Sequence, residues 1–301
     1  ICTGGNRTLT ATTSGGVSCS FVWQFSTNGG SSWTTISGAT SSTYNTGALT
    51  ATRQYRVRRL CGGVGCSDPF SNTVTVTVVA DPSVSITGGT TICTGGNRTL
   101  TATASGGTGN CSFQWQISTN NSTWSNISGA TGSTYNTGAL TATRFYRVRR
   151  SCTGSGCGTA TSNVQTVTVV ADPSVSITGG ATICSGGSRT LTATASGGTG
   201  NCSFQWQIST NGGSTFSNIN GATGSTYNTG ALTATRVYRV RRTCSGSGCN
   251  TATSNNQTIT VVPDPFISAS GGGQICPGGS RTLTASTSGG TGSCTIQWQR
   301  S

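Results

Sequence analysis

The sequence contains no histidine, methionine, lysine or glutamate, and charged residues make up only 7% of it. All 17 positive charges are arginine and all four negative charges are aspartate, which gives a net charge of +13. General acid–base catalysis needs a histidine or a tuned carboxylate beside the reacting group. Asp81, Asp172 and Asp264 lie in predicted linkers, and Asp68 lies in a tip loop of one repeat only. We therefore expect no catalytic residue and no enzyme activity.

The same scarcity argues against a metal or another cofactor. Cys61 and Cys66, the closest pair of cysteines, are five positions apart, and no histidine is present to complete a zinc site. Calcium sites need several carboxylates. We expect no metal ligand and no cofactor. The 14 cysteines are interpreted as disulfides formed in an oxidising, extracellular compartment.

Long apolar runs and helical periods are also missing. No segment has the length of a membrane span, and no signal peptide precedes Ile1, so we expect the true N-terminus to lie upstream. Instead, apolar and polar residues alternate, for example over residues 74–78 and 100–104. This period of two is typical of half-buried strands. The sequence therefore predicts an all-β protein.

The chain repeats itself about every 91 residues. An Ile-Cys-x-Gly-Gly motif contains Cys2, Cys93, Cys184 and Cys276, at spacings of 91, 91 and 92. Asp-Pro pairs at 81–82, 172–173 and 264–265 suit short linkers between repeats. The predicted domains are residues 1–80 without a first strand, two full repeats at 81–171 and 172–263, and the first three strands of another repeat at 264–301.

Each full repeat has the pattern of an immunoglobulin-like sandwich. The second is predicted to contain seven strands, at residues 83–87, 98–104, 112–118, 124–127, 133–140, 144–150 and 164–170. Seven short strands in about 90 residues, with a tryptophan on the third, are typical of that fold. We expect tandem sandwiches that form an elongated rod. The incomplete end repeats indicate a window on a longer array or, alternatively, completion by strands of another chain.

The strand order constrains how the cysteines pair. The cysteine before the tryptophan lies on the third strand and its partner on the neighbouring sixth strand. This predicts a staple within each repeat, namely Cys19–Cys61, Cys111–Cys152 and Cys202–Cys244.

The Ile-Cys cysteine lies at the opposite end of its repeat, about 20 Å from the remaining cysteine, and a disulfide needs Cα atoms within about 7 Å. We hypothesise bonds between neighbouring repeats, Cys2–Cys157 and Cys93–Cys249. Cys66 and Cys184 would then pair outside this window or with the incomplete repeat. The alternative is a small hairpin staple such as Cys61–Cys66 or Cys152–Cys157.

Arginines recur on the predicted sixth strand beside glutamines on the third. Alternation predicts one outward face with the following members: Arg56, Arg58, Arg147, Arg149, Arg239, Arg241, Gln114 and Gln116. Such a face could bind anionic polysaccharide or lipopolysaccharide at several weak sites. The alternative is a solvated face that maintains solubility and blocks edge pairing. No nucleic-acid-binding motif is present, so specific nucleic-acid binding is not expected.

The combined motifs resemble a known repeat class. Ile-Cys-x-Gly-Gly-x-Arg-Thr-Leu-Thr-Ala, Phe-Gln-Trp-Gln, Ile-Ser-Gly-Ala-Thr-x-Ser-Thr-Tyr and Tyr-Arg-Val-Arg-Arg are similar to the Ig-like repeats of large exported surface proteins of Bacteroidota. That class includes gliding-motility adhesins secreted by the type IX system. The four cysteines per copy and the basic sixth strand depart from the commoner repeats, so no ligand is carried over.

The resemblance implies an extracellular, non-catalytic adhesin or filament at the bacterial cell surface. We therefore expect a disulfide-stapled structural or adhesive rod whose partners are the neighbouring repeats. The alternative function is a subunit of a self-assembling filament or sheath, a homopolymer completed by strand exchange between chains.

Overall fold

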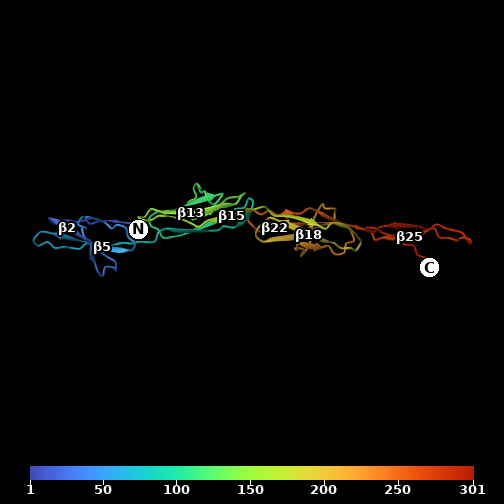
Figure 1. The fold of residues 1–301 in the computed structure, drawn as a ribbon, viewed down its shortest axis with the longest axis horizontal. Coiled ribbons are helices and arrows are strands. Elements are labelled where there is room, and N and C mark those ends of the chain that lie inside the picture. Colours follow the sequence, from blue (N-terminus) through green and yellow to red (C-terminus); the bar gives the residue numbers. More distant parts are fainter. The chain divides into compact units, whose positions relative to one another are not determined.

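The structure, a computed structural model, describes residues 1–301 and consists of strands and loops without helices (Figure 1). The prediction of an all-β chain is confirmed. The chain forms two compact units. The first consists of Ile1–Thr90, Arg98–Gly138 and Thr143–Thr168, and the second of Thr91–Asn97, Ala139–Ala142 and Val169–Ser301.

The third repeat, in the second unit, shows the architecture in full. Its strands are β16 (Ser174–Thr178), β17 (Ala181–Cys184), β18 (Thr190–Ser196), β19 (Cys202–Ser209), β20 (Ser217–Asn218), β21 (Thr226–Asn228), β22 (Arg236–Cys244), β23 (Ala252–Thr253) and β24 (Gln257–Val262). One sheet has the order β16-β18-β21, and the other has the order β17-β24-β22-β19-β20 with β23 beside β22. Two open sheets with this order form an immunoglobulin-like sandwich.

The second repeat has the same strands in the same order. They are β7 (Ser83–Thr87), β8 (Thr91–Cys93), β9 (Thr99–Ser105), β10 (Cys111–Ser118), β11 (Ser125–Asn126), β12 (Thr134–Asn136), β13 (Arg144–Cys152), β14 (Thr159–Thr161) and β15 (Gln165–Val170). The sheets are β12-β9-β7 and β11-β10-β13-β15-β8. Strands β13 and β15 lie side by side as an antiparallel pair (Figure 1).

The first repeat contains β1 (Thr8–Thr10), β2 (Cys19–Ser26), β3 (Thr34–Thr35), β4 (Thr43–Asn45), β5 (Arg53–Cys61) and β6 (Val74–Val76). Its sheets are β1-β4 and β3-β2-β5-β6. Ile1 is equivalent to Ile92 of repeat two, which follows β7. The tandem immunoglobulin-like fold, with three repeats of about 90 residues, is confirmed.

Some predicted strands differ in length from the observed ones. The second repeat adds the short strands β8 and β14 to the seven predicted. The strand predicted at 133–140 stops at Asn136, whose side-chain oxygen accepts the N–H of Gly138 at 2.8 Å. Gly138 has a φ of 64°, which turns the chain out of the sheet. Local side-chain bonding therefore ends a strand that alternation alone would extend.

The core of each repeat is centred on its tryptophan. In the third repeat, Trp206, Tyr238 and Leu191 are fully buried and pack with Ile177 and Ile259. The indole N–H of Trp206 donates to the carbonyl of Gly224 at 2.9 Å, so its polar group is satisfied inside the sandwich.

The last segment contains β25 (Phe266–Ser270) paired with β26 (Thr284–Ser288). A third strand, which we expected around Trp298, does not form. Phe266 and Trp298 stay 64% and 48% exposed, because two strands present no second sheet against which these side chains could pack.

Candidate functional site

Each full or nearly full repeat has one disulfide between neighbouring strands. Cys111 on β10 faces Cys152 on β13 in the antiparallel register, and Cys202 faces Cys244 in the same way. Their Cα atoms are 4.0 Å apart in both pairs, and 4.1 Å apart in the equivalent pair Cys19–Cys61. Each closes a loop of about 40 residues, which stabilises the fold by about 3–4 kcal/mol in the chain-entropy estimate.

A second kind of disulfide joins different repeats. In the first unit, Cys2 of repeat one is bonded to Cys157 of repeat two, with a Cα–Cα distance of 4.9 Å and a sequence separation of 155. The backbone N–H of Cys2 donates to the carbonyl of Ser155 at 2.8 Å, and the N–H of Asn6 donates to the Ser155 hydroxyl at 3.0 Å. The Ile-Cys-x-Gly-Gly loop is thus docked on the tip loop of the next repeat by polar contacts as well as by the covalent bond.

The same junction recurs in the second unit. Cys93 is bonded to Cys249, with Cα atoms 4.8 Å apart. Cys93 and Asn97 donate their backbone N–H groups to the carbonyl and hydroxyl of Ser247, at 2.9 and 3.0 Å. The structure therefore contains the five disulfides that we expected from the strand order and from cross-links between repeats. The alternative hairpin bonds Cys61–Cys66 and Cys152–Cys157 do not form in it.

The junction leaves no room for a side chain on the docked loop. A Cβ on Gly5 would overlap the carbonyl oxygen of Ser155, and one on Gly96 would overlap that of Ser247. On the facing loop, Gly156 has a φ of 79°. The second glycine of the Ile-Cys-x-Gly-Gly motif therefore serves this close approach of two backbones.

Four cysteines are free in the structure: Cys66, Cys184, Cys276 and Cys294. Cys66 is exposed and occupies the position that Cys157 and Cys249 hold in their repeats. Beside it, Val64 replaces the serine that accepts the docked loop in the other repeats, and Val64 is fully exposed. Repeat one therefore offers the thiol of such a junction without its serine hydroxyl.

The linkers are held by a contact that the sequence pattern did not reveal. The N–H of Gly107 donates to the carbonyl of Ala80 at 2.8 Å, and Gly198 donates to Ala171 at 2.9 Å. Arg150 reaches from β13 to the carbonyls of Ser105 and Gly106. The sequence does show that a Gly-Gly pair and an arginine recur in every repeat. It does not show which backbone carbonyls they bond, because those carbonyls lie far away along the chain.

Six of the eight residues of the expected arginine–glutamine face form hydrogen bonds or ion pairs with other residues of the chain. The Nε of Arg147 donates to Oε1 of Gln116 at 2.7 Å, and its guanidinium lies over the ring of Trp124 at 4.3 Å from the ring centre. Gln116 is 6% exposed and was wrongly expected to be open to solvent, because Arg147 and Asn126 cover it. Gln114 donates to the carbonyls of Trp115 and Ile127.

Equivalent side chains behave alike in the other repeats. Arg239 donates to Gln207 at 2.7 Å and lies over Phe216, and Arg56 donates to Gln24 at 2.8 Å between Trp33 and Phe70. Arg58 forms an ion pair with Asp68 at 3.0 Å. Arg149 and Arg241 remain exposed without a hydrogen-bond or ion-pair partner. The free part of the face is therefore smaller than alternation predicts.

The sandwich interior contains two tyrosine hydroxyls without a partner. Tyr146 and Tyr238 are fully buried, and neither hydroxyl makes a hydrogen bond. Burial, which disfavours the phenolate, raises the pKa of each to about 12, and the neighbouring tyrosine adds to the shift.

No group of three or more cysteine or aspartate side chains comes together in a way that could hold a metal ion. The structure also has no helix with the length and apolar character of a membrane span.

Solved structures with a similar chain trace contain immunoglobulin or fibronectin domains. A segment of titin is 14% identical, with 87% of this chain and 95% of that chain covered and a TM-score of 0.39. Fibronectin(III)-like modules of Clostridium thermocellum CbhA are 16% identical, with 59% and 92% covered and a TM-score of 0.31. A marsupial T cell receptor is 13% identical, with 86% and 97% covered and a TM-score of 0.35.

No curated protein matches the chain. One family model does, and it matches three times, over residues 1–80, 83–171 and 174–263. These matches cover most of the 301 residues. The chain therefore belongs to the family described as a domain of unknown function, DUF8696, and carries three copies of that domain in series.

Proposed function

We propose that this chain is a non-catalytic, load-bearing segment of an extracellular protein, and that it keeps its repeats joined under tension through disulfides between neighbouring repeats. The observation that carries the proposal is the recurrence of one junction, Cys2 with Cys157 and Cys93 with Cys249. A disulfide that only closed a local loop would join cysteines close in the sequence, whereas these cysteines are about 155 residues apart.

The two kinds of disulfide together shorten the covalent path along the chain. Tension that enters at Cys2 crosses to Cys157, follows the backbone to Cys152, crosses to Cys111, and follows the backbone to Cys93. From Cys93 it crosses again, to the next repeat. Each repeat of about 91 residues thus contributes about 23 residues of backbone to the load path. Most of each repeat is shielded from force.

Disulfides persist in oxidising environments outside the cytosol, which supports an extracellular location. The likeness of the motifs to exported Bacteroidota repeats favours a bacterial cell surface and an adhesive rod. Cys66 holds the position of Cys157 in its repeat, and Cys184 holds the position of Cys93, so each is placed to form a further junction of the same kind.

Non-reducing peptide mapping of the purified chain, alkylated at acid pH to prevent exchange, tests the proposal. We expect cross-linked peptides that contain Cys2 with Cys157 and Cys93 with Cys249, next to the three within-repeat pairs. Recovery of Cys152 bonded to Cys157, or of Cys244 bonded to Cys249, would contradict the load path, because either bond removes a junction.

Arg149 and Arg241 favour a second role, binding of an anionic surface glycan. Both are exposed and unpaired, one in repeat two and one in repeat three, so weak contacts would add through multivalency. The double variant Arg149→Ser/Arg241→Ser should lose retention on an immobilised acidic polysaccharide at low salt. Arg98→Ser/Arg189→Ser, which removes the same charge from the loops just before β9 and β18, is the matched control. Equal loss of retention in both variants would show that binding depends only on net charge.

A further inference from the structure

Three asparagines of the chain are followed directly by glycine, namely Asn28, Asn211 and Asn220. An asparagine in this position can lose its side-chain amide without an enzyme, because the backbone nitrogen of the next residue can attack its Cγ atom. Glycine has no Cβ atom and therefore hinders that attack least. The three asparagines differ in what holds their side chains.

Asn28 and Asn211 are locked in the loops between β2 and β3 and between β19 and β20. Oδ1 of Asn211 accepts the Ser209 hydroxyl at 2.8 Å and the backbone N–H of Thr215 at 2.9 Å. Its Nδ2 donates to the Thr215 hydroxyl at 2.8 Å. The side chain of Asn28 makes the same three contacts in repeat one, at 2.9, 3.0 and 2.8 Å. These hydrogen bonds must break before either side chain can meet the following backbone nitrogen.

Asn220 is exposed, and its side chain makes no hydrogen bond. It lies in a turn that is closed by the N–H of Ala222, which donates to the carbonyl of Ile219 at 3.2 Å. Gly221 has a φ of 73°, as the third residue of a type II turn requires. The space around Gly221 is open, and its N–H makes no hydrogen bond. The attacking nitrogen and the attacked amide are therefore both free.

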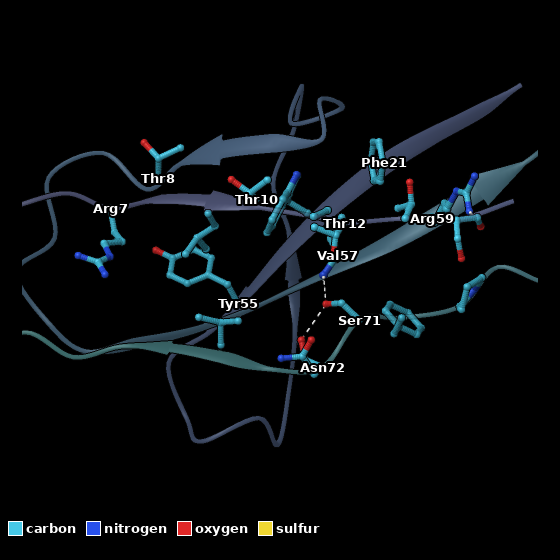
Figure 2. A pocket seen from close by; sticks show the side chains of 18 residues that line it. Arg7, Thr8, Thr10, Thr12, Phe21, Tyr55, Val57, Arg59, Ser71 and Asn72 are labelled. Atoms are coloured by element: carbon cyan, nitrogen blue, oxygen red, sulfur yellow. Dashed lines mark hydrogen bonds between the residues drawn. The ribbon is translucent and has the colours of Figure 1, made fainter. Parts of the chain in front are cut away.

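Exposure of an asparagine is not sufficient for this reaction. Asn72 in repeat one is exposed as well, and Figure 2 shows it beside Ser71, whose hydroxyl donates to the Asn72 carbonyl at 2.7 Å. The next residue is Thr73, whose branched side chain crowds the backbone nitrogen that would have to attack. Of the three Asn-Gly pairs, only Asn220–Gly221 combines a glycine with a free asparagine side chain.

We propose that Asn220–Gly221 is a site of spontaneous deamidation, which converts Asn220 to aspartate and isoaspartate and loosens repeat three around Trp206. The Gly221 nitrogen loses its proton to hydroxide and attacks Cγ of Asn220. The bond from Cγ to the amide nitrogen breaks, and that nitrogen takes a proton from water and leaves as ammonia. Water then opens the cyclic imide at either carbonyl, which gives aspartate or isoaspartate.

The turn that carries Asn220 is bonded to the central tryptophan of repeat three. The N–H of Ile219 donates to the Trp206 carbonyl at 2.9 Å, and the N–H of Trp206 donates to the carbonyl of Ala222 at 3.0 Å. The indole N–H donates to Gly224, just beyond the turn. In isoaspartate the backbone passes through the side chain and gains one methylene group. Ala222 then shifts relative to Ile219, so the two backbone bonds to Trp206 no longer match.

The other repeats provide a matched control for this turn. Repeats one and two have serine in place of Asn220, at Ser37 and Ser128. The same backbone bond closes the turn there, at 3.3 and 3.2 Å, and the glycine that follows has a φ of 76° and 71°. Serine has no amide to lose. Asn220→Ser is therefore expected to preserve the turn and to remove the reaction.

The test incubates the whole oxidised chain, with its free thiols alkylated, at neutral pH. Peptide mapping then separates the asparagine, aspartate and isoaspartate forms. We expect Asn220 to convert at least about tenfold faster than Asn28 and Asn211, because the hydrogen bonds of those two side chains must break first. The rate at Asn220 should rise in proportion to the hydroxide concentration. Thr215→Val, which removes one acceptor from Asn211, should speed conversion of Asn211 about fivefold and leave Asn220 unchanged.

Hydrogen exchange measures the effect on repeat three. In the isoaspartate form, the amides of Trp206 and Ile219 should exchange about tenfold faster than in fresh chain, whereas β10 of repeat two should not change. Asn220→Asp adds the carboxylate without the extra methylene group, so its exchange should stay close to that of fresh chain. Asn220→Ser should show neither conversion nor faster exchange after the same incubation.

Equal rates at the three asparagines, or faster conversion of Asn211 than of Asn220, would overturn the assignment of the site. Conversion to isoaspartate with unchanged exchange at Trp206 would refute the loosening of repeat three. Neither result bears on the disulfide junctions, so this inference and the proposed load path can fail independently.

Discussion

Arg147 and Arg149 lie two positions apart on β13 and have different environments. Arg147 bonds Gln116 and stacks on Trp124, whereas Arg149 extends into solvent without a partner. The difference arises from the loop before β11, which places Trp124 against the guanidinium of Arg147 and leaves Arg149 uncovered. At the scale of single residues, a stripe of identical charges thus contains both structural and free members.

This difference predicts unequal effects of matched substitutions. Arg147→Ser removes a charge-assisted hydrogen bond and a cation–π contact and leaves the buried Gln116 oxygen without its partner. We expect a loss of about 1–3 kcal/mol in the stability of repeat two. Arg149→Ser should change it by less than about 0.5 kcal/mol. Hydrogen exchange of β10 and β13 amides measures both, and equal values would refute the distinction.

The buried tyrosines predict a loss of stability in alkali. The pKa of Tyr146 and of Tyr238 is about 12 in the folded chain against 10.0 ordinarily. Between pH 10 and 12 the unfolded chain therefore releases protons that the folded chain retains. Stability is unaffected by these groups below pH 10 and falls as the pH rises towards 12, by about 2–3 kcal/mol per tyrosine.

Guanidinium unfolding at pH 9 and pH 11.5, on chain with alkylated free thiols, measures this fall. Tyr146→Phe removes the ionisable group and the unpaired hydroxyl, so repeat two of that variant should lose its share of the pH dependence. A variant with an unchanged pH dependence would show that the phenol ionises without unfolding.

At the scale of elements, the Ile-Cys-x-Gly-Gly loop is the part whose role changes with its surroundings. In repeats one and two it docks on a tip loop, and in repeat three Gly187 contacts only its own segment. The same motif therefore provides a matched pair of sites, one engaged and one free.

Gly96→Ala is expected to disrupt the engaged junction. The added methyl group overlaps the Ser247 carbonyl, which is backbone and cannot rotate away, so docking should cost about 1–3 kcal/mol. After oxidative refolding, the fraction of chain with a Cys93–Cys249 bond should fall, as measured by non-reducing peptide mapping. Gly187→Ala should leave that fraction unchanged. An equal yield in both variants would mean that the glycine serves only the turn.

At the scale of the whole molecule, the pattern of disulfides determines how far the chain can be extended by force, whatever the stability of any one repeat. With all five disulfides present, the covalent path from Ile1 to Ser301 contains about 76 residues and three disulfides. A fully extended residue spans about 3.5 Å. Fully unfolded by force, the oxidised chain should therefore extend to about 280 Å and the reduced chain to about 1,050 Å.

Single-molecule pulling from the two ends measures these lengths. With only the within-repeat disulfides, the path would contain about 175 residues and extend to about 610 Å. The double variant Cys93→Ser/Cys249→Ser should lengthen the oxidised chain by about 90 Å. An oxidised length near 610 Å would show that the repeats are not cross-linked, whatever their individual stability.

The sequence by itself determined the fold class and the repeat. Alternating residues such as those at 100–104 can bury one face only as a strand, and a period of 91 residues is long enough for one sandwich. The within-repeat pairing of Cys111 and Cys152 also followed from the sequence, since neighbouring strands in a known order bring fixed positions together.

Tertiary structure alone decided the rest. Alternation gives the face of a side chain but not what covers it, so it could not show that Gln116 lies beneath Arg147 and Asn126. Nor could alternation show that a side chain at position 5 would overlap the backbone carbonyl of Ser155, because the two residues lie about 150 positions apart in the chain.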